Sequence, residues 1–487
     1  MNEPGPLKVF ASNRSLPVLA GRLLFIATLF PACTSSPSKF ISPPAPARFP
    51  ETVQSVAQTR GLEPKQDIKL ADGARPNSAA ALPPIDFYNG APLVEVERVY
   101  KIIGLLPNAS DFGRALTEYR LVERFITYDR ATSSVSWTAN APQAGAPLAQ
   151  LSADKSRDFV PVFAIVQALQ EQHFGWRATI DKVALEDRRS AFRALAAGDA
   201  ALTLLTTGAK EEEVNPMPAQ LGIAAQIADE IDKLAASLPD FLRRQLTFPY
   251  RHGGQFVYWA FKAKGWQGVD GLYANPPLST AEILHPEKYF VERETPLRFF
   301  PAQLLRRFRE SPIVEQTLGE DAIIGLLMRD KSTKPPADMA AGWRGDQLFA
   351  FLQSGNPTII WFSSWRTEDQ AHGFFHAYRG VLEARHRLRF DAPASQTNGP
   401  LIARARDQRG WLLQKNGTVV LLVSTSAASR LGELAADAWT DLEIDKETME
   451  MRFESARSGS AIGEKQIAPA FSFYPAFAHE LFQMRLH

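Results

Sequence analysis

Few side chains of this sequence have the type and spacing that metal or nucleophilic chemistry needs. His372 and His376 lie four residues apart, which places two imidazoles on one face of a helix, the spacing of a zinc-binding pair. Gly373 stands where a metallopeptidase carries its glutamate base, so we interpret the histidines as a solvated surface pair. There is no phosphate-binding glycine loop, G-x-S-x-G elbow or dinucleotide fingerprint. We therefore predict no catalytic residue, no metal ligand and no cofactor.

The only cysteine, Cys33, has a position that suggests lipid attachment. Arg14 and Arg22 precede an apolar run at residues 23–30, and Cys33 follows three residues later. A run of this length suits a signal-peptide core better than a membrane span. The segment resembles a bacterial lipoprotein signal, which implies that residues 1–32 are removed and that Cys33 carries the lipid. The alternative is a short buried helix that happens to contain a cysteine.

The segment after Cys33 and the overall charge bear on location and partners. Residues 33–88 are rich in proline, serine and alanine without a sustained hydrophobic period, so we predict a disordered tether. Several acyl chains on one cysteine would anchor the protein stably to a membrane. The expected location is the cell envelope, at the outer membrane or periplasmic face of a Gram-negative cell. The net charge of +1 gives no basic excess, so nucleic acid is not an expected partner.

The chain is organised around residues 161–176, PVFAIVQALQEQHFGW. Pro161 suits the first turn of a helix, where a missing N–H is tolerated. Apart from Gln167, residues 162–169 are all apolar and surround the helix on every side, which predicts a buried helix, and the sequence then turns polar before Gly175. Without further information, this stretch is a core helix.

Part of the helix resembles a known zinc site. The segment ALQEQHF is similar to AHELTHALQDQHFDL, found in bacterial envelope proteins with a gluzincin-like His-Glu-x-x-His site. In this alignment Phe163 and Gln167 stand where the zinc-binding histidines would be, and Ala164 stands where the general-base glutamate would be. Residues 187–205, DRRSAFRALAAGDAALTLL, resemble the helix that supplies the third ligand, with Ala197 at the ligand position.

These four changes remove the chemistry that the resemblance would otherwise imply. Catalytic zinc needs about three protein ligands with nitrogen, sulfur or oxygen lone pairs and an open position for water. Phe163 and Ala197 supply no donor, and the amide of Gln167 is a poor substitute for imidazole. With Ala164 no general base remains. The resemblance therefore implies a degenerate member that has lost peptidase activity.

Further blocks extend the resemblance over residues 93–424. Residues 248–290 match the family's block ending in ILHPEKY, and residues 340–388 contain a region comparable to a later one. The resemblance implies an α+β fold: a mainly helical zincin-like domain at 89–330 with a small strand wall, then a smaller α+β domain at 331–487.

The resemblance also implies which side chains line the former cleft. Strands before the metal helix form a wall of the cleft in zincins, which would place Tyr128 and Trp137 near the old site. For these two, ordinary aromatic packing is the alternative. His285 could face the cleft, or could instead satisfy backbone groups in a buried turn. The candidates for the former cleft are Tyr128, His173, Asp199, Tyr250 and His285.

Local signals predict several elements directly. Ser279 can cap a helix, with Glu282 placed for a capping box. A strand, a turn and a strand are expected before a long helix from Thr367, and Asn416-Gly417 between two apolar runs predicts a hairpin.

Three functions remain open at this point. The favoured one is a lipid-anchored protein with a catalytically dead peptidase-like domain that binds a peptide or envelope partner in the former cleft. The second is a structural or assembly lipoprotein with a closed cleft, filled by Phe163; an accessible groove lined by Tyr128, His173 and His285 would argue against it. The third is an enzyme that uses a different site. The sequence leaves the partner and the oligomeric state open.

Overall fold

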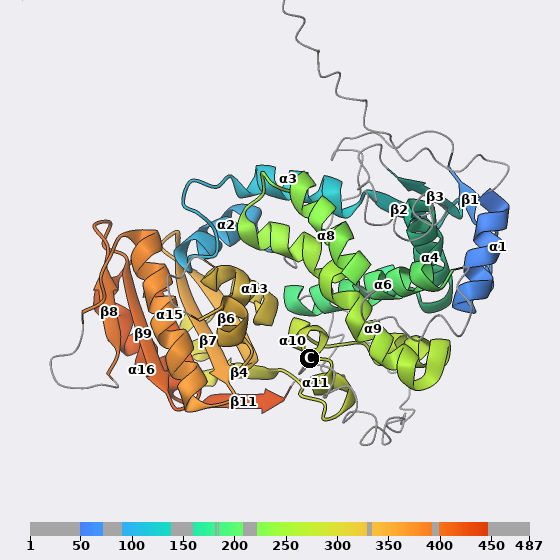
Figure 1. Ribbon diagram of the computed structural model, residues 1–487. Helices are drawn as coiled ribbons and strands as arrows, with labels where there is room; N and C mark the ends of the chain where they lie inside the picture. Colours follow the sequence, from blue (N-terminus) through green and yellow to red (C-terminus); the bar gives the residue numbers. More distant parts are fainter. Residues whose placement is uncertain are drawn as a thin grey trace, which may run out of the picture. The chain divides into compact units, whose positions relative to one another are not determined.

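The fold is α+β, with helices concentrated in the first part of the chain and an antiparallel sheet in the second (Figure 1). The structure is a computed structural model, and it describes residues 49–71, 90–137, 159–180, 183, 185–207, 222–328, 334–391 and 399–446. Cys33 and the predicted signal peptide lie outside the described residues, as does the end of the chain from 447.

The elements of the first part are mostly helices. In chain order they are α1 (Phe49–Arg60), β1 (Lys69–Leu70), α2 (Leu93–Ile102), α3 (Phe112–Glu123), β2 (Ile126–Asp129), β3 (Ser134–Trp137), α4 (Phe159–Phe174), α5 (Trp176–Ile180), α6 (Glu186–Thr206), α8 (Gly222–Leu234), α9 (Asp240–Ala274), α10 (Thr280–Leu284) and α11 (Glu287–Phe290). The three short strands form one sheet in the order β1-β3-β2. Helix α9 is kinked at Lys264 and Gly265, where the glycine has a φ of +58°.

Helices α6 and α9 cross at very close range. A Cβ atom at Gly198 would lie 2.2 Å from the carbonyl oxygen of Gly253, and one at Gly253 would lie 2.0 Å from the carbonyl oxygen of Ala194. Only glycine lets the two backbones approach this far. The crossing therefore depends on the two glycines, and it sets the position of α9 beside α6.

The second part is built on a six-stranded antiparallel sheet. Its elements are β4 (Leu297–Pro301), α12 (Ala302–Phe308), β5 (Val314–Gln316), α13 (Gly319–Leu327), α14 (Pro336–Ala340), β6 (Trp343–Gln353), β7 (Asn356–Trp365), α15 (Glu368–His386), β8 (Leu401–Arg404), β9 (Gly410–Asn416), β10 (Val419–Thr425), the 3-10 helix η6 (Ala428–Arg430), α16 (Leu431–Trp439) and β11 (Leu442–Lys446). The strand order is β5-β6-β7-β10-β9-β8, and β4 pairs separately with β11. The expected hairpin at Asn416-Gly417 is confirmed as β9–β10, and the expected helix follows its cap at Thr367.

The two faces of this sheet carry different helices because neighbouring strand residues point to opposite sides. Trp361 meets Tyr378 of α15 with ring centroids 5.1 Å apart. The next residue, Phe362, points the other way and meets Trp439 of α16 at 5.9 Å. The sheet is thus the middle of three layers, between α15 and α16.

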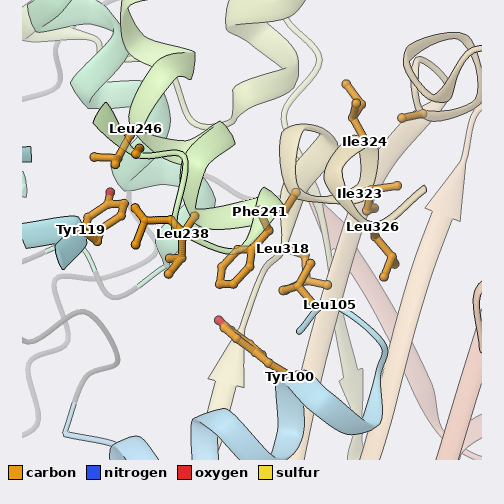
Figure 2. Packing of buried hydrophobic residues seen from close by; sticks show 14 of the residues in the cluster. Tyr100, Leu105, Tyr119, Leu238, Phe241, Leu246, Leu318, Ile323, Ile324 and Leu326 are labelled. Carbon is orange, nitrogen blue, oxygen red and sulfur yellow. The ribbon is translucent and has the colours of Figure 1, made fainter. Parts of the chain in front are cut away.

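The predicted division of the chain after residue 330 does not separate two cores. Tyr100 of α2 packs against Phe241 of α9 with ring centroids 5.7 Å apart, and Figure 2 shows both beside side chains of α13. From the later part of the chain, Tyr378 donates a hydrogen bond to the carbonyl oxygen of Ile103 at 3.0 Å. One hydrophobic cluster includes residues from α1 to β10. The described residues belong to one compact unit whose core crosses the predicted boundary.

The prediction of a tether through residues 33–88 is wrong for residues 49–71. Phe49, Val53 and Val56 of α1 are buried, and the helix packs against α4 and α6. The apolar residues recur every three to four positions, so one face of this helix is hydrophobic even though its surroundings are rich in proline and serine. Across the described parts of the chain, no helix has the length and apolar character needed to cross a membrane.

Candidate functional site

Helix α4 packs against α6 and carries two of the predicted metal positions, Phe163 and Gln167. The helix contains Pro161 in its first turn and ends before Gly175, which has a φ of +58°. Phe163, Gln167 and Gln170 are spaced to share one face. Gln170 Nε2 donates to the carbonyl oxygen of Ala196 at 3.0 Å, so this face meets α6 beside the third predicted ligand position.

An aromatic pair fills the position of the first predicted metal ligand. Phe163 is 1% exposed, and its ring stacks on Tyr250 of α9 with centroids 6.1 Å apart. Phe125 flanks Tyr250 at 6.4 Å. Burial raises the pKa of Tyr250, so the phenol stays neutral at ordinary pH. The neighbouring Ala164 is fully buried. This part of the predicted cleft is therefore packed with side chains.

A cation lies beside the second predicted ligand position. Arg177 Nη2 donates to Gln167 Oε1 at 2.8 Å. Ala197, at the third ligand position, is partly exposed and carries only a methyl group. In the described part of the chain, no three histidine, cysteine, aspartate or glutamate side chains are grouped so that they could hold a metal ion.

A charged cluster on α6 was not predicted. Arg193, one turn before Ala197, lies 3.0 Å from Glu123 Oε1 and 3.0 Å from Glu186 Oε1. Burial raises the pKa of Glu186, and the nearby arginines oppose this shift. The sequence offered little indication of this cluster, because Glu123 and Glu186 lie 70 and seven residues from Arg193. The one indication was an arginine one helical turn from a predicted ligand position.

At the end of α4, Gln172 contacts Tyr128 and His173 contacts the N-terminal segment. Tyr128 Oη accepts a hydrogen bond from Gln172 Nε2 at 3.1 Å and lies 3.3 Å from Ser133 Oγ. The ring of His173 bonds the carbonyl oxygen of Glu63 at 2.7 Å. Trp137, at the end of β3, is partly buried against the main hydrophobic cluster, which fits ordinary aromatic packing.

Asp199 was expected to line the former cleft, but it does not reach an open surface. It is fully buried, and its carboxylate accepts hydrogen bonds from Arg60 Nε at 2.6 Å, Tyr273 Oη at 2.8 Å and Gln170 Nε2 at 3.2 Å. The prediction failed because the partner, Arg60, belongs to the segment that the sequence had assigned to a tether. Asp199 is a buried counter-ion.

His285 contacts α13 rather than α4. Its Nε2 atom lies 2.7 Å from Glu320 Oε1, and Lys288 Nζ lies 3.4 Å from the other oxygen of that carboxylate. The alternative was that the His285 ring satisfies backbone groups in a turn. Its ring instead bonds the carboxylate of Glu320. The structure thus brings Tyr250 together with Phe163, and it links Tyr128 to Gln172, the neighbour of His173. His285 lies with Glu320 instead.

The histidine pair on α15 lies at the surface. His372 and His376 are both exposed, with ring centroids 4.3 Å apart. Partial burial and the neighbouring His372 lower the pKa of His376. The arrangement agrees with the expected solvated pair, and nothing in its geometry adds a third donor.

Comparison with known proteins finds one family. Residues 306–435, from within α12 to within α16, match the family described as Domain of unknown function (DUF8575). The matched part contains the six-stranded sheet with α13, α14 and α15. No curated protein and no solved structure matches the chain.

Proposed function

We propose that the protein is a lipid-anchored envelope protein whose helical region descends from a zinc peptidase and binds a peptide or envelope partner without cleaving it. The observation that carries the loss of cleavage is the stack of Phe163 on Tyr250. A buried phenyl ring, 1% exposed, stands where the first metal ligand would be. A phenyl ring has no lone pair to bind a metal ion, and this one is packed against the ring of Tyr250.

Electrostatics supports the same conclusion. Arg177 lies 2.8 Å from Gln167 Oε1, at the second ligand position. Because an arginine guanidinium stays protonated in proteins, it would repel a divalent cation placed nearby. Ala164 offers no carboxylate to accept a proton from an attacking water. Metal binding and general-base catalysis are both disfavoured at these positions.

Two side chains at the C-terminal end of α4 support peptide binding. Gln172 and His173, at the end of α4, direct an amide and an imidazole at main-chain atoms of another segment. Contacts of this kind hold an extended backbone and need no hydrolytic machinery. A helix that has lost its metal residues but keeps backbone-binding side chains fits a protein that retains peptide affinity.

Metal content is the first test. We expect no stoichiometric zinc in the purified protein by elemental analysis. His372→Ala and His376→Ala are introduced first, because two exposed imidazoles one helical turn apart can collect metal from the medium. Stoichiometric zinc that persists in this double variant would overturn the proposal.

Restoration tests the alignment. The restored variant combines the changes Phe163→His, Ala164→Glu, Gln167→His, Ala197→Glu and Arg177→Ala. The last removes the cation that the structure places beside Gln167. We expect this variant to bind zinc, and we expect a control without Ala197→Glu to bind it much more weakly. Equal zinc binding by both variants would show that α6 does not supply the third position.

A peptidase assay separates this proposal from the possibility of an enzyme that uses a different site. We expect no cleavage of a mixed peptide library, with or without a chelator. Cleavage that persists with the chelator would indicate an enzyme with a different site and would contradict the proposal.

A second candidate is a structural or assembly lipoprotein, and the burial of Phe163 against Tyr250 also favours it. A photo-crosslinking residue at position 173, next to Glu63, distinguishes the two. A partner crosslinked at 173 in intact cells, but not at the exposed position 372 of α15, would support binding. Absence of crosslinks at 173 would support the structural role.

A further inference from the structure

The segment after α1 runs along the end of α4 and the edge of β3. Lys69 N donates to the carbonyl oxygen of Ser133 at 2.9 Å, and Ala71 N donates to that of Val135 at 2.9 Å. Strand β1 is thereby added to β3 in the parallel direction. Without β1, strand β3 would be the edge of this sheet, and the groups that now pair with residues 69–71 would be open to another extended peptide.

Gln172 holds the same segment by its main chain. Its Oε1 atom accepts hydrogen bonds from Lys65 N at 2.8 Å and Gln66 N at 3.3 Å. Its Nε2 atom donates to the carbonyl oxygen of Gln66 at 3.1 Å. One amide therefore contacts both the N–H and the C=O of residue 66, and His173 bonds the carbonyl oxygen of Glu63 beside it. These contacts involve main-chain atoms of the bound segment. Two of its side chains add to them: Gln66 Oε1 accepts a hydrogen bond from Ser133 Oγ at 2.5 Å, and Ile68 is buried.

The segment is held less firmly than the helix before it. Between residues 63 and 71 the one buried side chain is Ile68, whereas Glu63, Lys65, Gln66, Asp67 and Lys69 are exposed. By contrast, α1 buries Phe49, Val56 and Arg60, and Arg60 is ion-paired with Asp199. Because few apolar contacts hold residues 63–71, this stretch can open while α1 stays in place.

We propose that Gln172, His173 and the edge of β3 form a site that binds an extended peptide backbone, and that residues 63–71 are its built-in occupant. A partner would bind by supplying an extended segment that displaces this stretch. The inference rests on the proposed function, since it identifies the ligand of the non-cleaving domain as a peptide bound through its main chain. The occupant keeps the site closed until a competing peptide arrives.

Proline substitutions release the occupant selectively. Lys65→Pro removes the N–H that bonds Gln172, and Lys69→Pro removes the one that bonds Ser133. The matched control is the double variant Lys65→Ala and Lys69→Ala, which loses the same exposed side chains but keeps both N–H groups. Hydrogen exchange at residues 63–71 should be faster in the proline variant, with the amides of α1 unchanged.

The binding probe is a labelled synthetic peptide with the sequence of residues 61–72, GLEPKQDIKLAD. In the control the attached segment competes at an effective concentration on the order of millimolar. By fluorescence anisotropy, we therefore expect the proline variant to bind the peptide at least about 10-fold more tightly than the control. Adding Gln172→Ala to the proline variant should reverse this gain. Equal affinity of the two proteins, or affinity that is insensitive to Gln172→Ala, would overturn the inference.

A second variant and a measurement on the bound peptide complete the test. If the prolines impair folding, Ile68→Asp releases the segment by removing its buried anchor, with exposed Asp67→Ala as the control. Mass spectrometry of the recovered peptide separates the two proposals. An intact bound peptide supports both, while a bound but cleaved peptide would leave the built-in occupant standing and refute the loss of hydrolysis.

Discussion

Arg60 Nε lies 2.6 Å from Asp199 Oδ1, and neither side chain is exposed to solvent. The pair joins α1 to α6 across 139 residues of sequence. Arg60 also binds Asp270 at 2.7 Å and lies over the ring of Trp266 at 4.7 Å. The N-terminal helix is therefore fixed to the helical region by a buried charge as well as by its apolar face. This fixed end is what makes residues 63–71 an attached segment rather than a free one.

Breaking this pair should destabilise the protein strongly. Arg60→Met leaves the buried carboxylate of Asp199 without its cation, and a loss of about 3 to 5 kcal/mol in the free energy of unfolding is expected. Urea denaturation measures it. The double variant Arg60→Met and Asp199→Asn should recover part of the loss. Arg114→Met, which removes an exposed partner of Glu118 on α3, should cost less than about 1 kcal/mol. A loss at Arg60 no larger than that at Arg114 would contradict the structural role of the Arg60–Asp199 pair.

A methyl group at the α6–α9 crossing should also be poorly tolerated. In Gly198→Ala the new Cβ would meet the carbonyl oxygen of Gly253 at 2.2 Å, so the helices must separate. We expect a loss of several kcal/mol, on the order of that seen for overpacked cores. The matched control is Gly373→Ala on α15, where no atom lies within 4 Å of the new Cβ. There the midpoint of thermal unfolding should stay constant or rise, because alanine favours a helix more than glycine does. Similar melting temperatures for the two variants would be evidence against the close crossing.

Local sequence patterns predicted the helix cap at Ser279 and the buried helix α4, because both depend on residues close together in the sequence. The Ser279 cap is confirmed, since its side chain accepts a hydrogen bond from Glu282 N. The Glu282 side chain reaches back and accepts a hydrogen bond from Leu278 N at 2.6 Å. The buried helix α4 was likewise evident from residues 162–169, which are all apolar except Gln167.

Contacts distant in sequence could not be predicted in this way. The pairing of β4 with β11 joins Leu297 to Lys446, and no local period indicates it. Arg60 looked like a residue of a polar linker because its partner Asp199 lies far along the chain. The resemblance supplied ligand positions, but it gave no sign that Arg177 would lie beside one of them. Which charges are buried together depends on tertiary packing, and that information is not local.

His252 should make the protein sensitive to acid. Burial lowers its pKa from 6.5 to about 3, and Arg244, Arg251 and His285 contribute. The unfolded chain therefore binds a proton near pH 6.5 that the folded protein does not take up until about pH 3. Stability is fully present above pH 6.5 and falls as the pH drops, by about 1.4 kcal/mol per pH unit from this group.

The test compares the wild-type protein with His252→Gln by urea denaturation between pH 7 and pH 4. The variant should lose less stability over this range, because it lacks the group that the unfolded chain protonates. His372→Gln, at an exposed position of α15, serves as the control and should follow the wild type. Parallel curves for the wild type and His252→Gln would show that this histidine is protonated equally in both states.

Asp346 joins α13 to the sheet through four hydrogen bonds. Its Oδ1 atom accepts from Gly319 N at 2.9 Å and Trp343 Nε1 at 3.0 Å, and its Oδ2 atom accepts from Leu318 N at 2.9 Å and Trp361 Nε1 at 2.9 Å. The residue is fully buried, so no water replaces a lost acceptor. In Asp346→Asn one oxygen becomes an NH2 group, which cannot accept, and two buried donors lose their partner. At about 1 to 3 kcal/mol for each, the free energy of unfolding should fall by roughly 2 to 6 kcal/mol.

Two indoles report on this site directly. Because Trp343 and Trp361 both donate to the carboxylate, Asp346→Asn should change the tryptophan fluorescence and the near-ultraviolet circular dichroism of the folded protein. Asp338→Asn, at an exposed position of α14, should leave the spectra and the stability unchanged within about 0.5 kcal/mol. If Asp346→Asn is as stable as the wild type, the carboxylate does not hold the start of α13 against β6 and β7 in the way the four distances imply.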